Sequence, residues 1–497
     1  MIKCNSCGAG MRFDPATQRL VCDYCNNTQD IFSQTGENIS EGSEAPAEYE
    51  TMIYTCPNCG GDICCDSDTA VTFCNYCGSS VELEGRLVTM EAPSGVIPFQ
   101  ITKEQAKEAY QKRCRQALFV PKYMKEESKL EQIRGIYMPY WLYDLDMKDD
   151  VHFKGKKSYR RGDYIITDHY RLTTNVDAHY EGTSFDASSN FTDELSMSIA
   201  PYKVAMEKPF SQGYLSGFYA DVADVKNKVY SQKSKEVVGD AITESLIHTK
   251  PYLQYGAGKE DGNIAKHLHI RKKRLAYFPV WFLATERQGY VSYAVINGQT
   301  GKLAADLPID PLKYVLFSIL LAVPIMLFFS LIPYAMTPIV LTVVSMILAV
   351  ISWLIGMGER KGLHTRLHSL DDWGLRSVKG QDLVPNEEEQ SENKKGDGLP
   401  MIGWKPWVGI IIGIILFFWG PVQDYYYYIG IVVIMLMVLW SFADIIWLHN
   451  QLTRRVPKQF ARRGGDDDYA RDIYAESQSE IFREESSKES GEDATNE

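Results

Sequence analysis

The sequence lacks the short motifs that mark many nucleotide-dependent and hydrolytic enzymes. It contains no G-x-S-x-G, no H-E-x-x-H and no G-x-G-x-x-G, and the run GAGKED at 256–261 misses the upstream glycine and the Ser/Thr of a P-loop. His267 and His269 alternate within the basic stretch HLHIRKKR, and we expect them on a solvated face or near acidic lipid. The sequence therefore predicts that the protein is not an enzyme.

Positive charge is missing from much of the cysteine-rich part of the chain. No Lys or Arg occurs between Thr51 and Gly85, and residues 1–27 carry three basic against two acidic side chains. Binding to nucleic-acid phosphates needs clustered Lys and Arg, so direct nucleic-acid binding is not expected. The net charge is −12, and residues 466–497 supply −9 of it through twelve acidic and three basic residues. That segment is typical of a solvated, disordered tail.

An apolar signal-peptide region is also lacking, because the N-terminus reads MIKCNSCG. A secreted protein stapled by disulfides is therefore not expected. Eight of the eleven cysteines instead form two copies of one pattern, in which two C-x2-C pairs lie about 15 residues apart, and an offset of 52 residues superposes them. They are Cys4, Cys7, Cys22 and Cys25 in the first copy, and Cys56, Cys59, Cys74 and Cys77 in the second.

Two C-x2-C pairs on facing turns can aim four thiolates at one point, as a structural Zn²⁺ site requires. The sequence thus predicts two closed, structural zinc sites in two small β zinc ribbons, at residues 1–27 and 51–85. Iron in a rubredoxin-like site is the main alternative, because four thiolates suit both metals. Cys64, Cys65 and Cys114 fall outside the pattern and are expected to be free thiols.

Four long apolar runs predict a membrane region. Tyr314–Ile332 and Ile339–Met357 carry no charge and form one hairpin, whereas Trp407–Val422 and Ile429–Trp447 form a second. Tryptophans and Tyr425–Tyr428 suit the bilayer interfaces. Asp444, near the end of the last run, is more typical of an interface than of an ion path.

Basic residues set the expected orientation. ERKGLHTRLHS follows the second run and HNQLTRRVPKQFARR follows the fourth, while the two short turns contain no Lys or Arg. The positive-inside rule then places both termini in the cytosol of a multi-pass protein of the bacterial cell membrane. Cysteines that bind metal as thiolates need the same reducing compartment.

The remaining segments complete a multidomain architecture. Residues 95–309 mix helical and strand patterns and predict an α+β cytosolic domain, with a helix that begins after an N-capping Thr102. Tyr137–Leu142 and Tyr277–Phe282 share the pattern Tyr-x-Pro-x-Trp and are expected to be core strands. The expected boundaries are a linker at 28–50, membrane hairpins at 314–357 and 402–447, a cytosolic loop at 358–401, and a basic, then acidic tail at 448–497.

The chain resembles the bacterial TFIIB-type zinc-ribbon membrane proteins, in which one or more ribbons precede a shared soluble domain and a membrane anchor. The resemblance covers roughly 1–310 and is carried by the first cysteine set and by VIPFQITKEQAKEAYQKRC from Val96, GIYMPYWLYD at 135–144, PFSQGYLSGFYAD at 209–221, and YFPVWFLA with VINGQTGKLAADLP. This chain departs from the group in having two ribbons and four apolar runs. The resemblance implies no established enzymatic activity, and it implies partners in membrane assemblies with scaffold proteins of the envelope-stress type.

The leading hypothesis is a multi-pass membrane protein that displays cytosolic zinc ribbons as an adaptor or scaffold for protein partners. Two alternatives stay open. One is a component of a transporter or membrane enzyme that uses Asp444, and the other is a membrane-tethered nucleic-acid-binding factor.

Overall fold

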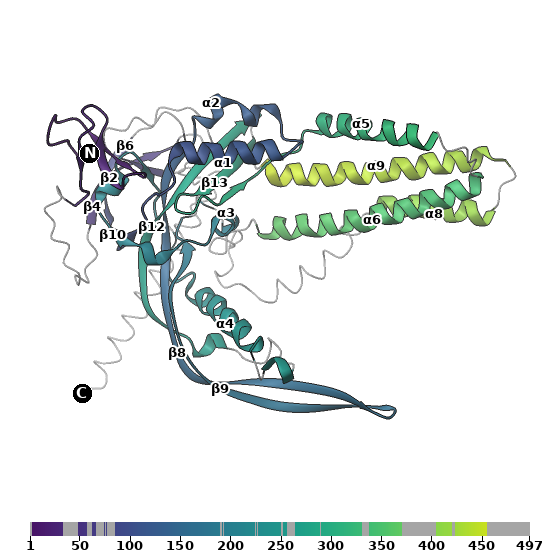
Figure 1. The fold of residues 1–497 in the computed structure, drawn as a ribbon, viewed down its shortest axis with the longest axis horizontal. Coiled ribbons are helices and arrows are strands. Elements are labelled where there is room, and N and C mark those ends of the chain that lie inside the picture. Colours follow the sequence, from purple (N-terminus) through teal and green to yellow (C-terminus); the bar gives the residue numbers. More distant parts are fainter. Residues whose placement is uncertain are drawn as a thin grey trace, which may run out of the picture.

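The computed structural model describes residues 2–32, 48–56, 62–65, 74, 76, 85–188, 191, 193–223, 225, 227–249, 252–255, 264–288, 290–330, 337–369, 404–419 and 423–454. A body built around a large β-sheet carries the N-terminal strands at one end and a group of long helices at the other (Figure 1). A two-stranded arm leaves the body beside the helices. The expected 28–50 linker, 358–401 loop and 448–497 tail lie largely outside the described residues.

The first cysteine set lies in a small antiparallel sheet, as expected of a ribbon. β1 (Met11–Asp14) pairs with β2 (Arg19–Cys22), which pairs with β3 (Thr28–Gln29). Alternate residues point inward, so that Met11, Phe13 and Leu20 are buried. Their burial joins this sheet to the core of the body, which also contains Tyr214 and Phe218.

The strands after the first ribbon form one sheet of eleven strands. The main path runs β10-β7-β12-β8-β11-β5-β4-β6, with β9 on β8, β13 on β12 and β14 on β13. The strands are β4 (Glu48–Thr55), β5 (Asp62–Cys65), β6 (Gly85–Glu91), β7 (Gly95–Val96), β8 (Arg134–Arg161), β9 (Tyr164–Asp186), β10 (Lys208–Pro209), β11 (Tyr219–Ala220), β12 (His269–Arg287), β13 (Tyr290–Asn297) and β14 (Leu303–Ala305). β5 and most of β4 lie within the second expected ribbon at 51–85, whereas β6 begins at its last residue, and β5 joins the rest through Cys64 opposite Ala220 of β11.

The two Tyr-x-Pro-x-Trp segments pair with each other at the centre of the sheet. In the antiparallel β8–β12 register, Pro279 lies opposite Tyr137 and Tyr277 lies opposite Pro139. Both tyrosines are buried. The expectation that these segments are core strands is confirmed, and the sheet is held by apolar and aromatic burial on both faces.

Four α-helices and several single turns accompany the sheet. They are α1 (Lys103–Gln116), α2 (Glu127–Leu130), α3 (Asp193–Ile199) and α4 (Ser231–Ile247). The sheet and these helices confirm an α+β body. α1 begins as the sequence predicts, because Thr102 Oγ1 accepts a hydrogen bond from Gln105 N at 3.3 Å and Gln105 Oε1 accepts one from Thr102 N at 2.9 Å.

This reciprocal cap makes a first prediction. Thr102→Ala should lower the free energy of unfolding by about 1 kcal/mol, because the Gln105 N–H loses its partner at the start of α1. Thr102→Ser keeps an oxygen at the same place and should cost much less. Thermal unfolding of the purified protein measures the difference, and equal midpoints for the two variants would contradict a capping role.

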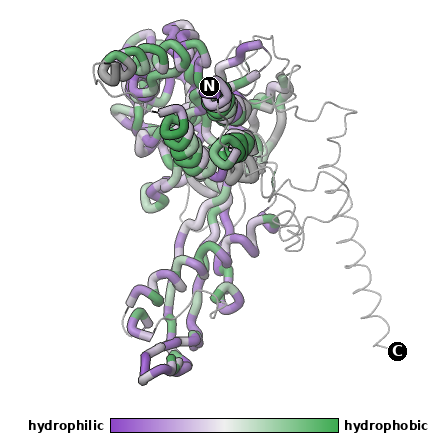
Figure 2. Tube along the Cα trace, turned by 90° about the vertical axis from the view of Figure 1, so that its right-hand side faces the viewer, coloured by the Kyte–Doolittle hydropathy of each residue, from purple (hydrophilic) through white to green (hydrophobic). Residues whose placement is uncertain are grey.

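The arm is formed by the outer halves of β8 and β9. The two strands stay paired from Tyr140 opposite Asp186 to Arg161 opposite Tyr164, and Figure 1 shows them curving away from the body. The tip is polar in Figure 2, where it contrasts with the hydrophobic helices. Its sequence from Lys154 to Arg161 reads KGKKSYRR, with exposed Tyr159 and Tyr164 beside it.

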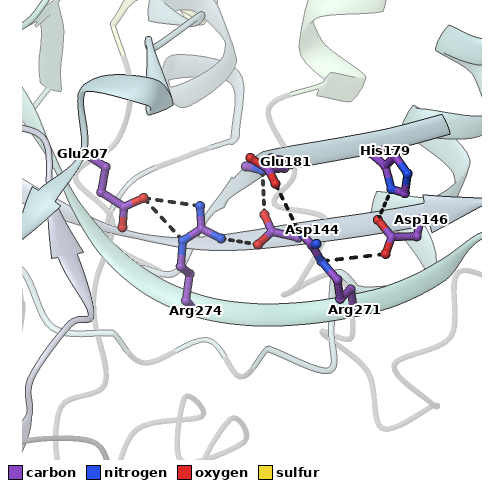
Figure 3. A network of polar contacts seen from close by, with 8 residues as sticks. Asp144, Asp146, His179, Glu181, Glu207, Arg271 and Arg274 are labelled. Atoms are coloured by element: carbon purple, nitrogen blue, oxygen red, sulfur yellow. Dashed lines mark hydrogen bonds and ion pairs between the residues drawn. The ribbon is translucent and has the colours of Figure 1, made fainter. Parts of the chain in front are cut away.

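An ion-pair network stands where the arm leaves the sheet (Figure 3). The register shifts between Tyr143 and Leu145 of β8, and Asp144 accepts a hydrogen bond there from Gly182 N at 2.8 Å. Arg274 of β12 bonds Asp144 and lies 3.3 Å from Glu207 Oε2. These charged groups are paired at a bulge, the type of irregularity that bends a strand.

A second, more exposed group of side-chain contacts continues the network along the arm. Arg271 Nη2 lies 3.0 Å from Glu181 Oε1, and His179 Nδ1 lies 2.9 Å from Asp146 Oδ1. Further along, His267 Nδ1 lies 2.5 Å from Asp149 Oδ2. His267 and His269 are therefore part of the arm's solvated surface, and His267 has an acidic partner that the sequence pattern did not indicate.

The apolar runs form helices α5 (Pro311–Ser330), α6 (Pro338–Ser369), α8 (Trp404–Trp419) and α9 (Tyr425–Thr453). Buried Ala349, Ile410 and Ile434 join α6, α8 and α9 in one cluster. Gly413 lets α8 approach α6 closely, because a Cβ there would lie 2.4 Å from Met346 Sδ. Asp444 lies within α9 and is partly buried.

Among the described helices, two are long and apolar enough to cross a membrane. They cover Pro338–Leu363 and Tyr425–Asn450, and in each only 17% of the most apolar window is buried within the protein. The apolar parts of the other two expected spans are shorter, at Pro311–Pro324 and Trp407–Trp419. Among the described residues, two helices therefore have membrane-spanning length and composition, and the apolar segments found within α5 and α8 are shorter.

Candidate metal centre

The first cysteine set converges on one point. The sulfur atoms of Cys4, Cys7, Cys22 and Cys25 all lie within 4.8 Å of one another. Cys4 Sγ is 3.5 Å from Cys25 Sγ, and Cys7 Sγ is 3.5 Å from Cys22 Sγ. Four thiolates placed tetrahedrally around Zn²⁺ at about 2.3 Å lie roughly 3.8 Å apart, so these side chains fit the ion.

Each C-x2-C pair lies on a tight turn whose backbone faces the sulfur. Gly8 N donates to Cys4 O at 2.9 Å and has a φ of +74°, a left-handed conformation that favours glycine, as its place after Cys7 suggests. Ser6 N donates to Cys4 Sγ at 3.4 Å. At the second turn Asn26, with a φ of 55°, donates its N–H to Cys22 O at 2.9 Å.

The electrostatics of the four thiols favour a bound cation. Burial raises the pKa of Cys4, but hydrogen bonds from the backbone of Ser6 and Cys7 outweigh it and lower the pKa to about 6. At Cys7 the Ala9 N–H lowers the pKa, whereas the neighbouring cysteine side chains and burial raise it to about 12. Charge on one thiol thus opposes charge on the next, and a divalent cation would relieve that opposition in the set.

The ribbon is anchored to the body by packing and by hydrogen bonds, among them one from Phe13 N to Ser216 O at 2.9 Å. Phe13 packs edge-on against Tyr214 at a centroid distance of 5.4 Å and also contacts Phe218. Gln18 Nε2 donates to Phe99 O at 2.7 Å. A metal bound by the four cysteines would join the two turns of a ribbon that already packs on the body, which is a structural role.

The second cysteine set lies partly outside the described residues. Cys56 and Cys74 are described, both are buried, and both belong to a core cluster with Ile63 and Tyr76. Cys59 and Cys77 fall in the part of the chain that the structure does not describe. Cys56 and Cys74 could hold a metal as a pair, and a second four-thiolate site stays a prediction.

The three cysteines outside the repeat differ in their surroundings. Cys64 is buried in β5 beside β11, and Cys114 is buried in α1. Burial raises the pKa of Cys114, so its thiol stays protonated and unreactive near neutral pH. Cys65 is the last residue of β5 and pairs with Met52 of β4.

The two copies of the cysteine repeat differ in the solvent exposure of one pair of equivalent residues. Tyr24 and Tyr76 occupy equivalent positions, but Tyr24 is 84% exposed on the first ribbon, whereas Tyr76 is 2% exposed and packs edge-on against Phe282. Sequence spacing assigned them the same place. Tyr24 lies on the turn between Cys22 and Cys25, and tyrosine is a residue type enriched at protein–protein interfaces.

One of the comparisons with known proteins identifies a related protein. No family model and no solved structure matches the chain. The "Uncharacterized protein YdjG" of Bacillus subtilis (strain 168) is 30% identical over 315 residues, which cover 62% of this chain and 90% of the relative. The chain therefore belongs to the same family as Bacillus subtilis YdjG.

Proposed function

We propose that this protein is a non-enzymatic membrane adaptor that presents a zinc ribbon to a protein partner in the cytosol. The observation that carries the proposal is the separation of its two ends. The ribbon of β1 and β2 occupies one end of the long axis, and α5, α6, α8 and α9 extend from the other (Figure 1). A module held at the end away from the bilayer is accessible to partners.

The helical end supports the membrane part of the proposal. α6 and α9 have the length and composition of spans, and many large apolar side chains on all four helices are exposed. We assign α5 and α8 to the same membrane region, as the shorter members of two hairpins. The basic stretch at the end of α6 (ERKGLHTRLHS, 359–369) and the basic residues after α9 favour a cytosolic location for both termini in a bacterial cell.

The chemistry of the ribbon supports protein recognition. A four-thiolate site leaves no open coordination position for catalysis. The ribbon lacks the clustered cations that phosphate binding needs, since Arg12 is paired with Asp23 at 2.6 Å. Exposed Tyr24 supplies an aromatic contact on a rigid turn, and envelope-stress scaffold proteins are the class of partner that the family resemblance suggests.

Exchange of Tyr24 tests the adaptor function separately from folding. Tyr24→Ser should lower partner recovery from detergent-solubilised native membranes about tenfold or more, because a buried aromatic anchor contributes roughly 2 kcal/mol to an interface. Zinc content and membrane insertion should stay at the level of the unmodified protein, since Tyr24 is exposed and is not a ligand.

Tyr159→Ser is the matched control, because Tyr159 is also exposed but lies at the tip of the arm. Unchanged recovery in Tyr24→Ser would remove the exposed face of the first ribbon as the partner surface. Recovery of the full chain in the soluble fraction of a cell lysate would remove the membrane part of the proposal.

A further inference from the structure

A cavity of about 550 Å³ lies where the helical region meets the body. Its walls come from the start of α5, the end of α9, the β12–β13 turn and the single helical turn η1 (Lys122–Lys125). If α6 and α9 cross a membrane, this cavity lies at the level of the cytosolic head groups. The inference drawn from it deepens the proposed function and rests on it for the source of the ligand.

Hydrogen bonds hold the end of α9 against the body and so define the cavity. Asn450 bonds Ile309 twice, through Oδ1 to the backbone N–H at 2.7 Å and through Nδ2 to the carbonyl at 2.9 Å. Ser292 Oγ of β13 donates to Thr453 O at 2.7 Å. Arg454 follows directly and is therefore fixed at the cavity wall.

Four cationic side chains from separate elements line the cavity: Lys122, Arg287, Lys313 and Arg454. Two carboxylates, Glu126 and Asp310, share the wall, so positive charge is in excess. Asp310 is occupied at the start of α5, where Oδ1 accepts a hydrogen bond from Leu312 N at 3.1 Å. These cations are not only basic residues that flank apolar helices, because Lys122 and Arg287 belong to the body.

The arginines are placed to receive an anion. Arg287 stacks over Tyr123, with its guanidinium carbon 4.2 Å from the ring centroid, which fixes its plane and leaves its edge available for hydrogen bonds. Arg454 Nε is buried and has no hydrogen-bond partner among the described residues. A buried donor without a partner is costly, so a turn of the Arg454 side chain that brings Nε to an oxygen-rich anion would be favourable.

The rim of the cavity is apolar on the side of α5. Leu312 and Leu316 line it, and both side chains are largely exposed. A ligand with an anionic head and an alkyl tail would match the cations inside and the leucines along α5. We infer that this cavity binds the phosphate of an anionic phosphate ester, with an anionic phospholipid of the surrounding bilayer as its source.

The full chain in a neutral detergent allows a direct test. Phosphatidylglycerol should raise its thermal unfolding midpoint, whereas phosphatidylcholine should not. Arg287→Gln combined with Arg454→Gln should weaken phosphatidylglycerol binding about a hundredfold, because a hydrogen bond to a charged group contributes roughly a factor of ten per arginine. Native mass spectrometry of the same samples reads the bound lipid independently of stability.

Arg160→Gln combined with Arg161→Gln is the matched control, because it removes the same charge from the exposed tip of the arm. This control should bind phosphatidylglycerol as the unmodified protein does. Glycerol phosphate forms a further arm of the test. If it binds as tightly as the lipid and competes with it, the phosphate site stands with a soluble source in place of the bilayer.

Unchanged lipid binding in the Arg287→Gln, Arg454→Gln protein overturns the inference, as does equal loss of binding in the arm-tip control. Failure of the proposed membrane function would give a different result from failure of the lipid site. A chain found in the soluble fraction would exclude the bilayer as the source, while the glycerol phosphate arm would still report on the cavity.

Discussion

Cys7→Ser should remove one metal ion per chain and unfold the first ribbon. Cys7 Sγ is one of four sulfur atoms that converge within 4.8 Å, and three thiolates with a hydroxyl make a much weaker site for Zn²⁺. The ribbon has few apolar residues of its own, so metal binding and folding are coupled in it. Elemental analysis of the purified protein measures the metal.

The loss should spread into the body. Phe13 and Leu20 are buried in the core that contains Tyr214 and Phe218, and an unfolded ribbon would uncover those aromatic rings. Hydrogen exchange should therefore rise at the turn Gln212–Leu215 as well as in β1 and β2. The helices at the opposite end should keep their protection, since no ribbon residue belongs to their cluster.

Cys114→Ala is the control, because Cys114 is a buried thiol in α1 that does not belong to the four converging sulfurs. Its metal content should match that of the unmodified protein. Absence of metal from the unmodified protein, or full metal content in Cys7→Ser, would contradict the assignment. Iron in place of zinc would keep the four ligands and change only the ion.

Arg274→Met should be the most destabilising change at the base of the arm. The Arg274 and Asp144 side chains are 16% and 6% exposed, and Arg274 also serves Glu207. Removal of one partner leaves a buried charge without compensation, which costs about 3–5 kcal/mol. The thermal unfolding midpoint should fall by several degrees, and hydrogen exchange should rise where β8, β9 and β12 meet.

Arg271→Met is the matched control on the same strand. Arg271 is 51% exposed, and solvent screens its ion pairs with Asp146 and Glu181, so the change should be much smaller. Asp144→Asn placed in the Arg274→Met protein should recover part of the loss, because the buried charge is then removed. Equal effects of the two arginine variants would show that burial does not decide the strength of this network.

Local patterns were sufficient for a large part of the fold. The C-x2-C spacing identified Cys4, Cys7, Cys22 and Cys25, because a turn of fixed length aims its thiols without help from distant residues. Thr102 marked the start of α1 for the same reason, since a cap involves residues only three apart. The apolar runs located all four long helices, although the apolar segments described in α5 and α8 are shorter than those in α6 and α9.

Long-range pairing was not accessible from such patterns. The segment 51–85 reads as a separate small ribbon, yet β5 within it joins the large sheet through Cys64 opposite Ala220. Asp144, Glu207 and Arg274 come from three distant segments and have no shared motif. The cations that line the cavity between the helical region and the body are equally far apart in the sequence, and of these only Arg454 lies in the basic stretch that follows the fourth apolar run.

The sequence by itself determined the four converging cysteines of the first ribbon, the capped helix and the apolar helices, because each depends on residues close together in the chain. Only the tertiary structure decided which surfaces are free. Tyr24 and Tyr76 hold equivalent places in the repeat, but the sheet that receives β5 buries Tyr76 and leaves Tyr24 exposed. The burial of a residue depends on which distant strands pack beside it, and the spacing within a repeat does not determine that packing.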